Sequence, residues 1–280
     1  MFQDLLAATV FGLLLLGIHR KVIARIQQRP GPPVWQEILH ALKFSFKSTW
    51  VPKTASGTLF VGIVLIGIAI WVAAFYVVTS GGSLLLLFAI YMLHKIVEHG
   101  YGLSSGSPYG KFGGVRSVIS AASEIPLFVS VAGIYLLTGS LLISDITAFE
   151  AARGPLLLLA PPAIFALYVV LVSKMPFGPF SIVEGKEIVS GYKTEHFGVW
   201  RAGLEVCHGL KTSVLLYTFV LLTVGTLPLL WMVLALLAVQ VSLSFVCALS
   251  PMLSPFDSVT VQSLIAGGVL LYFGVLGVIP

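Results

Sequence analysis

Residues 57–79 read GTLFVGIVLIGIAIWVAAFYVVT, a run of 23 residues without a charged side chain. An α-helix needs about 20 mostly apolar residues to cross the hydrocarbon core of a bilayer, and this run has that length. The stretch therefore predicts a transmembrane helix.

The whole chain has the composition of a membrane protein. Of its 280 residues, 58% are hydrophobic and 10% are charged, and the mean hydropathy is +1.02. A soluble domain carries about 25% charged residues, because water must wet its surface. The composition excludes a soluble domain, and the net charge of +5 is therefore not evidence of nucleic-acid binding.

Apolar segments recur along the chain. We predict an all-α, polytopic bundle of about eight transmembrane helices that forms a single integral membrane domain over residues 1–280. The first segment has no positive n-region and no small-residue cleavage site, so we expect a retained helix, not a signal peptide. The expected spans are residues 5–19, 57–79, 83–97, 118–139, 155–173, 199–224, 226–248 and 258–279.

Lysine and arginine are concentrated in the connections after the first, third and fifth segments. These connections and their edges hold 14 of the 16 basic residues. The positive-inside rule places such loops in the cytoplasm. We therefore expect a multi-pass protein of the cell membrane, with its long loops cytoplasmic and both termini outside. The acidic stretch 140–154 is expected to be an outer loop, and Asp145, Glu150 and Asp257 are expected to lie in loops.

The first connection contains a helix of another kind. Beyond Pro33, the apolar residues Val34, Ile38, Leu42 and Phe46 recur at helical spacing. This pattern predicts an amphipathic helix at the membrane surface. Two interpretations remain open for it, a helix that rests on lipid and a docking surface for a cytoplasmic partner.

Ionisable side chains follow one face of the sixth segment. Arg201, Glu205, His208 and Lys211 are separated by steps of four, three and three residues, which places them on a single helical face. Charged groups inside a membrane usually face the bundle interior and mark an ion or proton path. Histidine suits such a path because it titrates near neutral pH. A purely structural pair, with Arg201 neutralising Glu205, is the alternative.

Further carboxylates lie beside or within apolar segments. The loop MPFGPFSIVEGKEIVSGYKTEHFGVW, residues 175–200, interleaves its acids with apolar side chains that favour burial. A solvated acidic loop, an interfacial Glu98 and a helix-start Glu124 are the structural alternatives. The candidate proton or coupling path consists of Glu98, Glu124, Glu184, Glu187, Glu195, Glu205 and His208.

The two cysteines, Cys207 and Cys247, both fall inside apolar segments and have no CxxC partner. We interpret them as packing residues. The sequence has no pattern of metal or haem ligands, so we expect no cofactor in this chain and no catalytic residue. Any redox cofactor would belong to another subunit.

Four motifs, in order, resemble one family. They are QRPGPP at 28–33, LKFSFKSTWVP at 42–52 after Gln36, GSPYGKFGGVR at 106–116, and Pro176-Phe177 followed by Glu184, Glu187 and GYKTEHFG at 191–198. Together they resemble the core membrane subunit shared by respiratory complex I and the energy-converting, membrane-bound nickel–iron hydrogenases. The resemblance spans nearly the whole chain, and the last motif is the most specific.

The resemblance implies a role in a larger assembly. It implies an eight-helix subunit that docks hydrophilic iron–sulfur and hydrogenase-like large subunits on the cytoplasmic side and contacts antiporter-like membrane subunits. Such a complex would be ferredoxin-linked and would couple electron transfer to H⁺ or Na⁺ translocation. Iron–sulfur clusters, with or without a nickel–iron site, would lie in the partners. The residues implied at partner-facing loops are Arg29, His40, Lys43, Lys47, Arg116 and Arg201.

The chain departs from the family pattern at several acidic positions. His40, Ser48, Ser117 and Gly178 stand where the family carries acids. These losses keep open the same role in a sulfur- or polysulfide-reducing complex, or in a quinone-reducing enzyme like complex I. A stand-alone secondary transporter and an inert membrane anchor are hypotheses from other classes.

Overall fold

A computed structural model describes residues 2–121, 124–185 and 189–275, apart from the side chain of Glu184. In these ranges the regular structure is helical, with one isolated antiparallel bridge between Ser83 and Leu142. The elements are α1 (Phe2–Ile26), α2 (Gln36–Ser45), α3 (Gly57–Thr79), α4 (Leu84–Ser104), α5 (Pro108–Ser120), α6 (Glu124–Thr138), α7 (Ile143–Arg153), α8 (Leu156–Leu159), α9 (Pro161–Lys174), the 3₁₀ turns η2 (Ile182–Glu184) and η4 (Gly191–Glu195), α10 (Val199–Val224), α11 (Leu229–Leu249) and α12 (Pro255–Val275).

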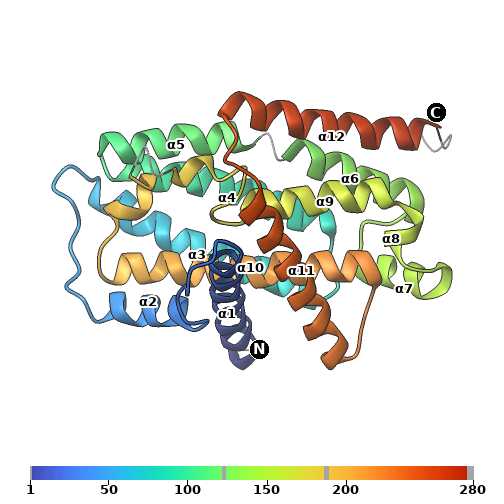
Figure 1. The fold of residues 1–280 in the computed structure, drawn as a ribbon, viewed down its shortest axis with the longest axis horizontal. Helices are drawn as coiled ribbons and strands as arrows, with labels where there is room; N and C mark the ends of the chain where they lie inside the picture. Colours follow the sequence, from blue (N-terminus) through green and yellow to red (C-terminus); the bar gives the residue numbers. More distant parts are fainter. Residues whose placement is uncertain (1, 122–123, 186–188, 276–280) are drawn as a thin grey trace.

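Helix α10 is the central element of the bundle. In its most apolar stretch 83% of the residues are buried, against 28% to 44% in the other candidate spans. It contacts α1, α2, α3, α9 and α11 (Figure 1), whereas α12 packs with α6 and α9. Polar groups on α10 are therefore sheltered by its neighbours, which is what a charged helix inside a membrane requires.

Glycines allow α1 to approach α10 at backbone distance. A methyl group added at Gly12 would lie 1.8 Å from the carbonyl oxygen of Gly209, and one added at Gly209 would lie 3.0 Å from the carbonyl oxygen of Thr9. Small residues at such crossings let membrane helices pack closely in the absence of a strong hydrophobic driving force between them. This crossing fixes α1 against the polar face of α10.

The predicted membrane bundle is confirmed. The described chain has seven helices long and apolar enough to cross a bilayer, when residues 108–138 are counted as one stretch, and the shorter α9 is also apolar. Each predicted segment contains a helix. Residues 57–79 and 199–224 coincide with α3 and α10, because the glycine or serine beside each end is a local signal.

Three details differ from the sequence-based expectations. Residues 143–153 of the expected outer loop form α7, and Asp145 and Glu150 lie on it, while Asp257 lies in the first turn of α12. The segment 155–173 is divided into α8 and α9, because Pro161 cannot continue the ladder of α8. Helix α2 exists as predicted, but its exposed apolar face runs along Trp35, Leu39, Leu42 and Phe46.

Candidate functional site

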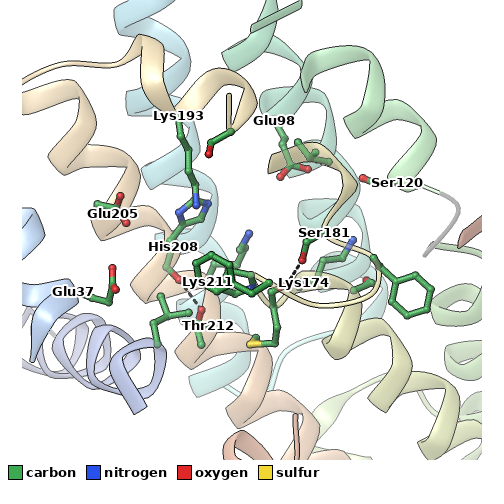
Figure 2. A pocket seen from close by; sticks show the side chains of 18 of the residues that line it. Glu37, Glu98, Ser120, Lys174, Ser181, Lys193, Glu205, His208, Lys211 and Thr212 are labelled. Carbon is green, nitrogen blue, oxygen red and sulfur yellow. Dashed lines mark hydrogen bonds between the residues drawn. The ribbon is translucent and has the colours of Figure 1, made fainter. Parts of the chain in front are cut away.

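A cavity of about 370 Å³ lies between α1, α2, α4, α5, α9, α10 and the α9–α10 loop. Figure 2 shows that Glu37 and Glu205 approach it from one side and Glu98 and Ser120 from the other, with the Lys211 side chain between them in this view. Its charged and histidine lining residues are Arg20, Glu37, His40, Lys95, Glu98, Lys174, Lys193, Arg201, Glu205, His208 and Lys211.

The first buried ion pair joins two residues of α4. Lys95 Nζ donates to Glu98 Oε2 at 2.7 Å and to Ser120 Oγ at 2.8 Å. The other carboxylate oxygen, Glu98 Oε1, accepts from the hydroxyl of Tyr192 at 3.4 Å. The carboxylate is therefore held by groups from both α4 and the α9–α10 loop.

The second buried ion pair joins the neighbouring helices α9 and α6. Lys174 Nζ, at the end of α9, lies 3.5 Å from Glu124 Oε1 at the start of α6. The same ammonium lies 4.9 Å from the centre of the Tyr91 ring, a favourable cation–π arrangement. The predicted burial of Glu124 is found, and its partner is a lysine from another helix.

The polar face predicted on α10 lines the cavity as one surface. Arg201 Nη2 lies 2.8 Å from Glu205 Oε1, and the Arg201 guanidinium also donates to the carbonyl oxygen of Lys193. His208 and Lys211 follow on the same face and also line the cavity. The structural interpretation of the sequence, an ion pair between Arg201 and Glu205, is therefore found. The pair is part of a charged wall of the cavity.

A fourth ion pair joins α1 to α2 beside the cavity. The Arg20 guanidinium donates to Glu37 Oε1, and His40 Nδ1 lies 3.7 Å from Glu37 Oε2. Glu37 is buried although it belongs to a short surface helix. This contact explains why α2 turns its apolar stripe outward: its inner face carries the polar groups that meet the cavity.

A buried histidine fastens the cavity wall to two helices. His19 of α1 is fully buried, with Nε2 2.8 Å from the carbonyl oxygen of Pro176 and Nδ1 2.9 Å from Ser244 Oγ of α11. Pro176 lines the cavity and precedes Phe177, whose φ of 61° is in the left-handed region. The Pro176–Phe177 turn is thus fixed from outside the loop.

Four apolar side chains in the described part of the α9–α10 loop pack into the protein, whereas Phe177 and Val189 are exposed. The buried four are Phe180, Ile182, Val183 and Tyr192, as the interleaved pattern predicts. Arg116 Nη1 donates to the carbonyl oxygen of Ile182 at 3.1 Å, so α5 also holds the loop.

His196 closes this loop before α10. Its ring stacks on Phe60 at 4.3 Å, and Nδ1 lies 2.9 Å from the carbonyl oxygen of Tyr192. Burial lowers the pKa of His196 from 6.5 to about 4, because a charged ring would be poorly solvated there. The ring is therefore neutral at physiological pH.

The structure does not bring all the predicted site residues together. Glu195 ends η4, is partly buried and is not part of the cavity lining, and Arg29, Lys43 and Lys47 are exposed. The side chain of Glu184 and residue Glu187 lie outside the described part of the chain. The cavity therefore joins Glu98, Glu205 and His208 directly, with Glu124 connected through Lys174.

Several site residues escape prediction from the sequence. Lys95 and Lys174 have the pattern of loop-edge cations, and Arg20 and Glu37 that of surface charges. A signal for Lys95 is present, because a cation three residues before Glu98 shares its helical face. Nothing local in the sequence pairs Lys174 with Glu124 or Arg20 with Glu37, since these contacts depend on how helices pack.

Another buried carboxylate, Glu150, is not part of the cavity lining. Glu150 of α7 accepts from the backbone N–H of Leu156 at 3.0 Å, next to the end of α10 at Gly225. Burial raises the pKa of Glu150 from 4.5 to about 7. No sequence pattern indicates this burial.

Comparisons with known proteins agree with the resemblance carried by the four motifs. The family model for NADH dehydrogenase matches residues 2–270. A Methanocaldococcus jannaschii protein, provisionally named as an NADH-ubiquinone oxidoreductase, is 51% identical over 267 residues, which are 94% of this chain and 90% of the relative. The H subunit of the NADH-quinone oxidoreductase of Bacillus cytotoxicus is 31% identical over 215 residues, 69% of this chain and 64% of its own length.

The fold is also found in a solved structure. A chain of the membrane-bound sulfane sulfur reductase, an archaeal respiratory membrane complex, superposes with a TM-score of 0.85 and covers 97% of both chains at 23% identity. This likeness concerns the fold alone. From the family model and the extended identity to its relatives, the chain belongs to the NADH dehydrogenase family, as a membrane subunit of the H type.

Proposed function

We propose that this chain is the membrane subunit of a ferredoxin-linked respiratory complex that couples electron transfer to H⁺ or Na⁺ translocation. In this role its basic loops dock a hydrophilic module that carries the iron–sulfur clusters. Antiporter-like membrane subunits receive the coupling signal. The family membership and the respiratory relatives support an assembly of this kind.

The observation that carries the proposal is the charged cavity inside an apolar bundle. Three carboxylates, Glu37, Glu98 and Glu205, line it with a cation beside each, and Glu124 is connected through Lys174. Burying such charges is costly even when they are paired. A subunit that only anchored an enzyme would be stable with apolar side chains at these positions.

Within the proposal, the carboxylates carry the proton or the electrostatic signal. The path would use Glu98, Glu124, Glu205 and His208, together with the loop acids Glu184, Glu187 and Glu195 that the family resemblance adds. Paired charges at these distances respond to one another, so a redox event beside the loops would alter which carboxylate holds a proton.

The test uses the native complex in sealed vesicles. Glu98→Gln and Glu205→Gln are each expected to reduce ion translocation at least tenfold while the complex still assembles. Asp145→Asn is the matched control, because Asp145 is an exposed carboxylate of α7 that accepts from Ser140. Full translocation in both glutamine variants would remove the relay role of these residues.

The same role in a sulfur-reducing complex is the second candidate. The fold likeness to a sulfane sulfur reductase chain and the missing acids at 40, 48, 117 and 178 favour it. Metal analysis of the purified complex separates the candidates, since nickel indicates a hydrogenase and its absence together with sulfur reduction indicates the alternative. Purification of this chain from native membranes without iron–sulfur or antiporter-like partners would instead support a stand-alone transporter.

A further inference from the structure

A hydrogen bond between α3 and α4 determines the state of a buried histidine. Trp71 is 0% exposed and His94 is 3% exposed, and the indole Nε1–H of Trp71 donates to Nδ1 of His94 at 3.1 Å. The rings meet edge to face, with centres 5.1 Å apart. An indole nitrogen can only donate, so Nδ1 must carry a lone pair. A neutral His94 then has its hydrogen on Nε2.

A proton on Nδ1 would break this contact. The indole N–H would face another N–H inside the bundle, and a buried donor without an acceptor is unfavourable. Charged side chains around the ring come from its own helix, Lys95 and Glu98 of α4, and from two others, Lys211 of α10 and Lys174 of α9.

We infer that Trp71 is a positioning residue that holds His94 as a neutral hydrogen-bond donor. His94 then acts on the neighbouring ion pairs through its Nε2–H and does not itself take up and release the transported proton. The Nε2 atom is buried and has no hydrogen-bond partner among the described residues. Its N–H is therefore available to a water molecule or to a carboxylate that changes position. The part of this inference that concerns transport rests on the proposed function.

The position of the hydrogen can be measured directly. His94 and Lys95 form the chain's only His–Lys dipeptide, so labelling with ¹³C,¹⁵N-histidine and ¹⁵N-lysine assigns the His94 ring signals without a variant. In the purified complex, ¹⁵N spectra are expected to show a bare Nδ1 and a protonated Nε2 at every pH from 5 to 8. A protonated Nδ1 at any of these pH values would overturn the inference.

Trp71→Phe tests the cause of this state. Without the indole donor, a protonated Nδ1 is expected to appear in the His94 spectrum, and an unchanged spectrum would refute the role of Trp71. Should this variant not fold, magnetisation transfer from the Trp71 indole N–H to His94 Nδ1 in the wild-type complex gives the same information. A missing transfer would count against the contact.

The role in transport has its own test. His94→Gln preserves an acceptor for Trp71 and a donor at the far end, whereas His94→Phe removes both. The glutamine variant is expected to retain at least half of the translocation rate, and the phenylalanine variant to lose at least tenfold. Equal loss in both would mean that His94 carries a proton. Because the spectra need no translocation, failure of the proposed function would leave the hydrogen-position test intact.

Discussion

Removing the lysine of the Lys95–Glu98 pair should strongly destabilise the bundle. The two side chains are only 9% and 10% exposed, and their charged atoms lie 2.7 Å apart. Lys95→Met would leave the Glu98 carboxylate buried without the Lys95 ammonium. Of the two donors described above, only the Tyr192 hydroxyl would remain. Loss of one member of a buried pair typically costs about 3–5 kcal/mol, against about 0–1 kcal/mol for an exposed pair.

The double variant separates the interaction from general damage. Lys95→Met combined with Glu98→Gln removes both charges, so the stranded carboxylate no longer exists. We expect the loss in free energy of unfolding of the double variant to be smaller than the sum of the two single losses by about 2–3 kcal/mol. Ser120 loses a donor in both lysine variants, and this effect cancels in the cycle.

The assay is equilibrium unfolding of the detergent-purified protein at increasing mole fraction of SDS, with wild type, both single variants and the double variant measured together. The free energy of unfolding is compared around the cycle. Additive losses within about 0.5 kcal/mol would show that the two charges do not interact, and the buried network would then be refuted at this pair.

The remaining predictions concern packing and pH. Gly12→Ala should destabilise the protein by about 3 kcal/mol or more in the same unfolding assay, because its methyl group would collide with the Gly209 carbonyl, whereas Gly62→Ala, with open space around it, should be neutral or slightly stabilising. Because the pKa of Glu150 is raised in the folded protein, the unfolded chain loses this proton at lower pH, and the free energy of unfolding should fall as pH rises from about 4.5 to 7. Glu150→Gln should remove this loss, so it should raise the melting temperature at pH 8 but not at pH 4. Equal shifts at both pH values would contradict the prediction. The pKa of His196 is lowered in the folded protein, so the unfolded chain takes up this proton first and the free energy of unfolding should fall as pH decreases from 6.5 to about 4. The melting temperature of a His196→Gln variant should depend less on pH over this range. A variant whose melting temperature falls as steeply as that of the wild type would exclude His196 as the source.

The sequence predicts the spans well because each is encoded locally. Residues 57–79 and 199–224 end where Gly and Ser interrupt the apolar run, and the structure places helix ends at the same residues. The polar face of α10 is predictable for the same reason, since steps of three and four residues define a face within one helix.

The pairing of charges is not predictable, because it depends on contacts between helices. Lys174 ends α9 and Glu124 begins α6, and no sequence pattern gives the register between these two elements. The burial of Glu37 and Glu150 has the same origin, since both lie on short helices that read as surface segments. Their surroundings come from α1 and from the end of α10 and the start of α8, which only the assembled bundle brings near.

The surroundings of His19 allow two hydrogen-bond patterns at Ser244. Ser244 has a single hydroxyl hydrogen, and its oxygen lies 2.7 Å from the carbonyl oxygen of Gln240 as well as 2.9 Å from His19 Nδ1. With a neutral ring, this hydrogen can satisfy one neighbour at a time. With a doubly protonated ring, the imidazole donates to both Pro176 and Ser244 while the hydroxyl turns to Gln240. A proton on Nδ1 would thus reverse the His19–Ser244 hydrogen bond and fix the hydroxyl on Gln240, while the attachment to Pro176 stays the same.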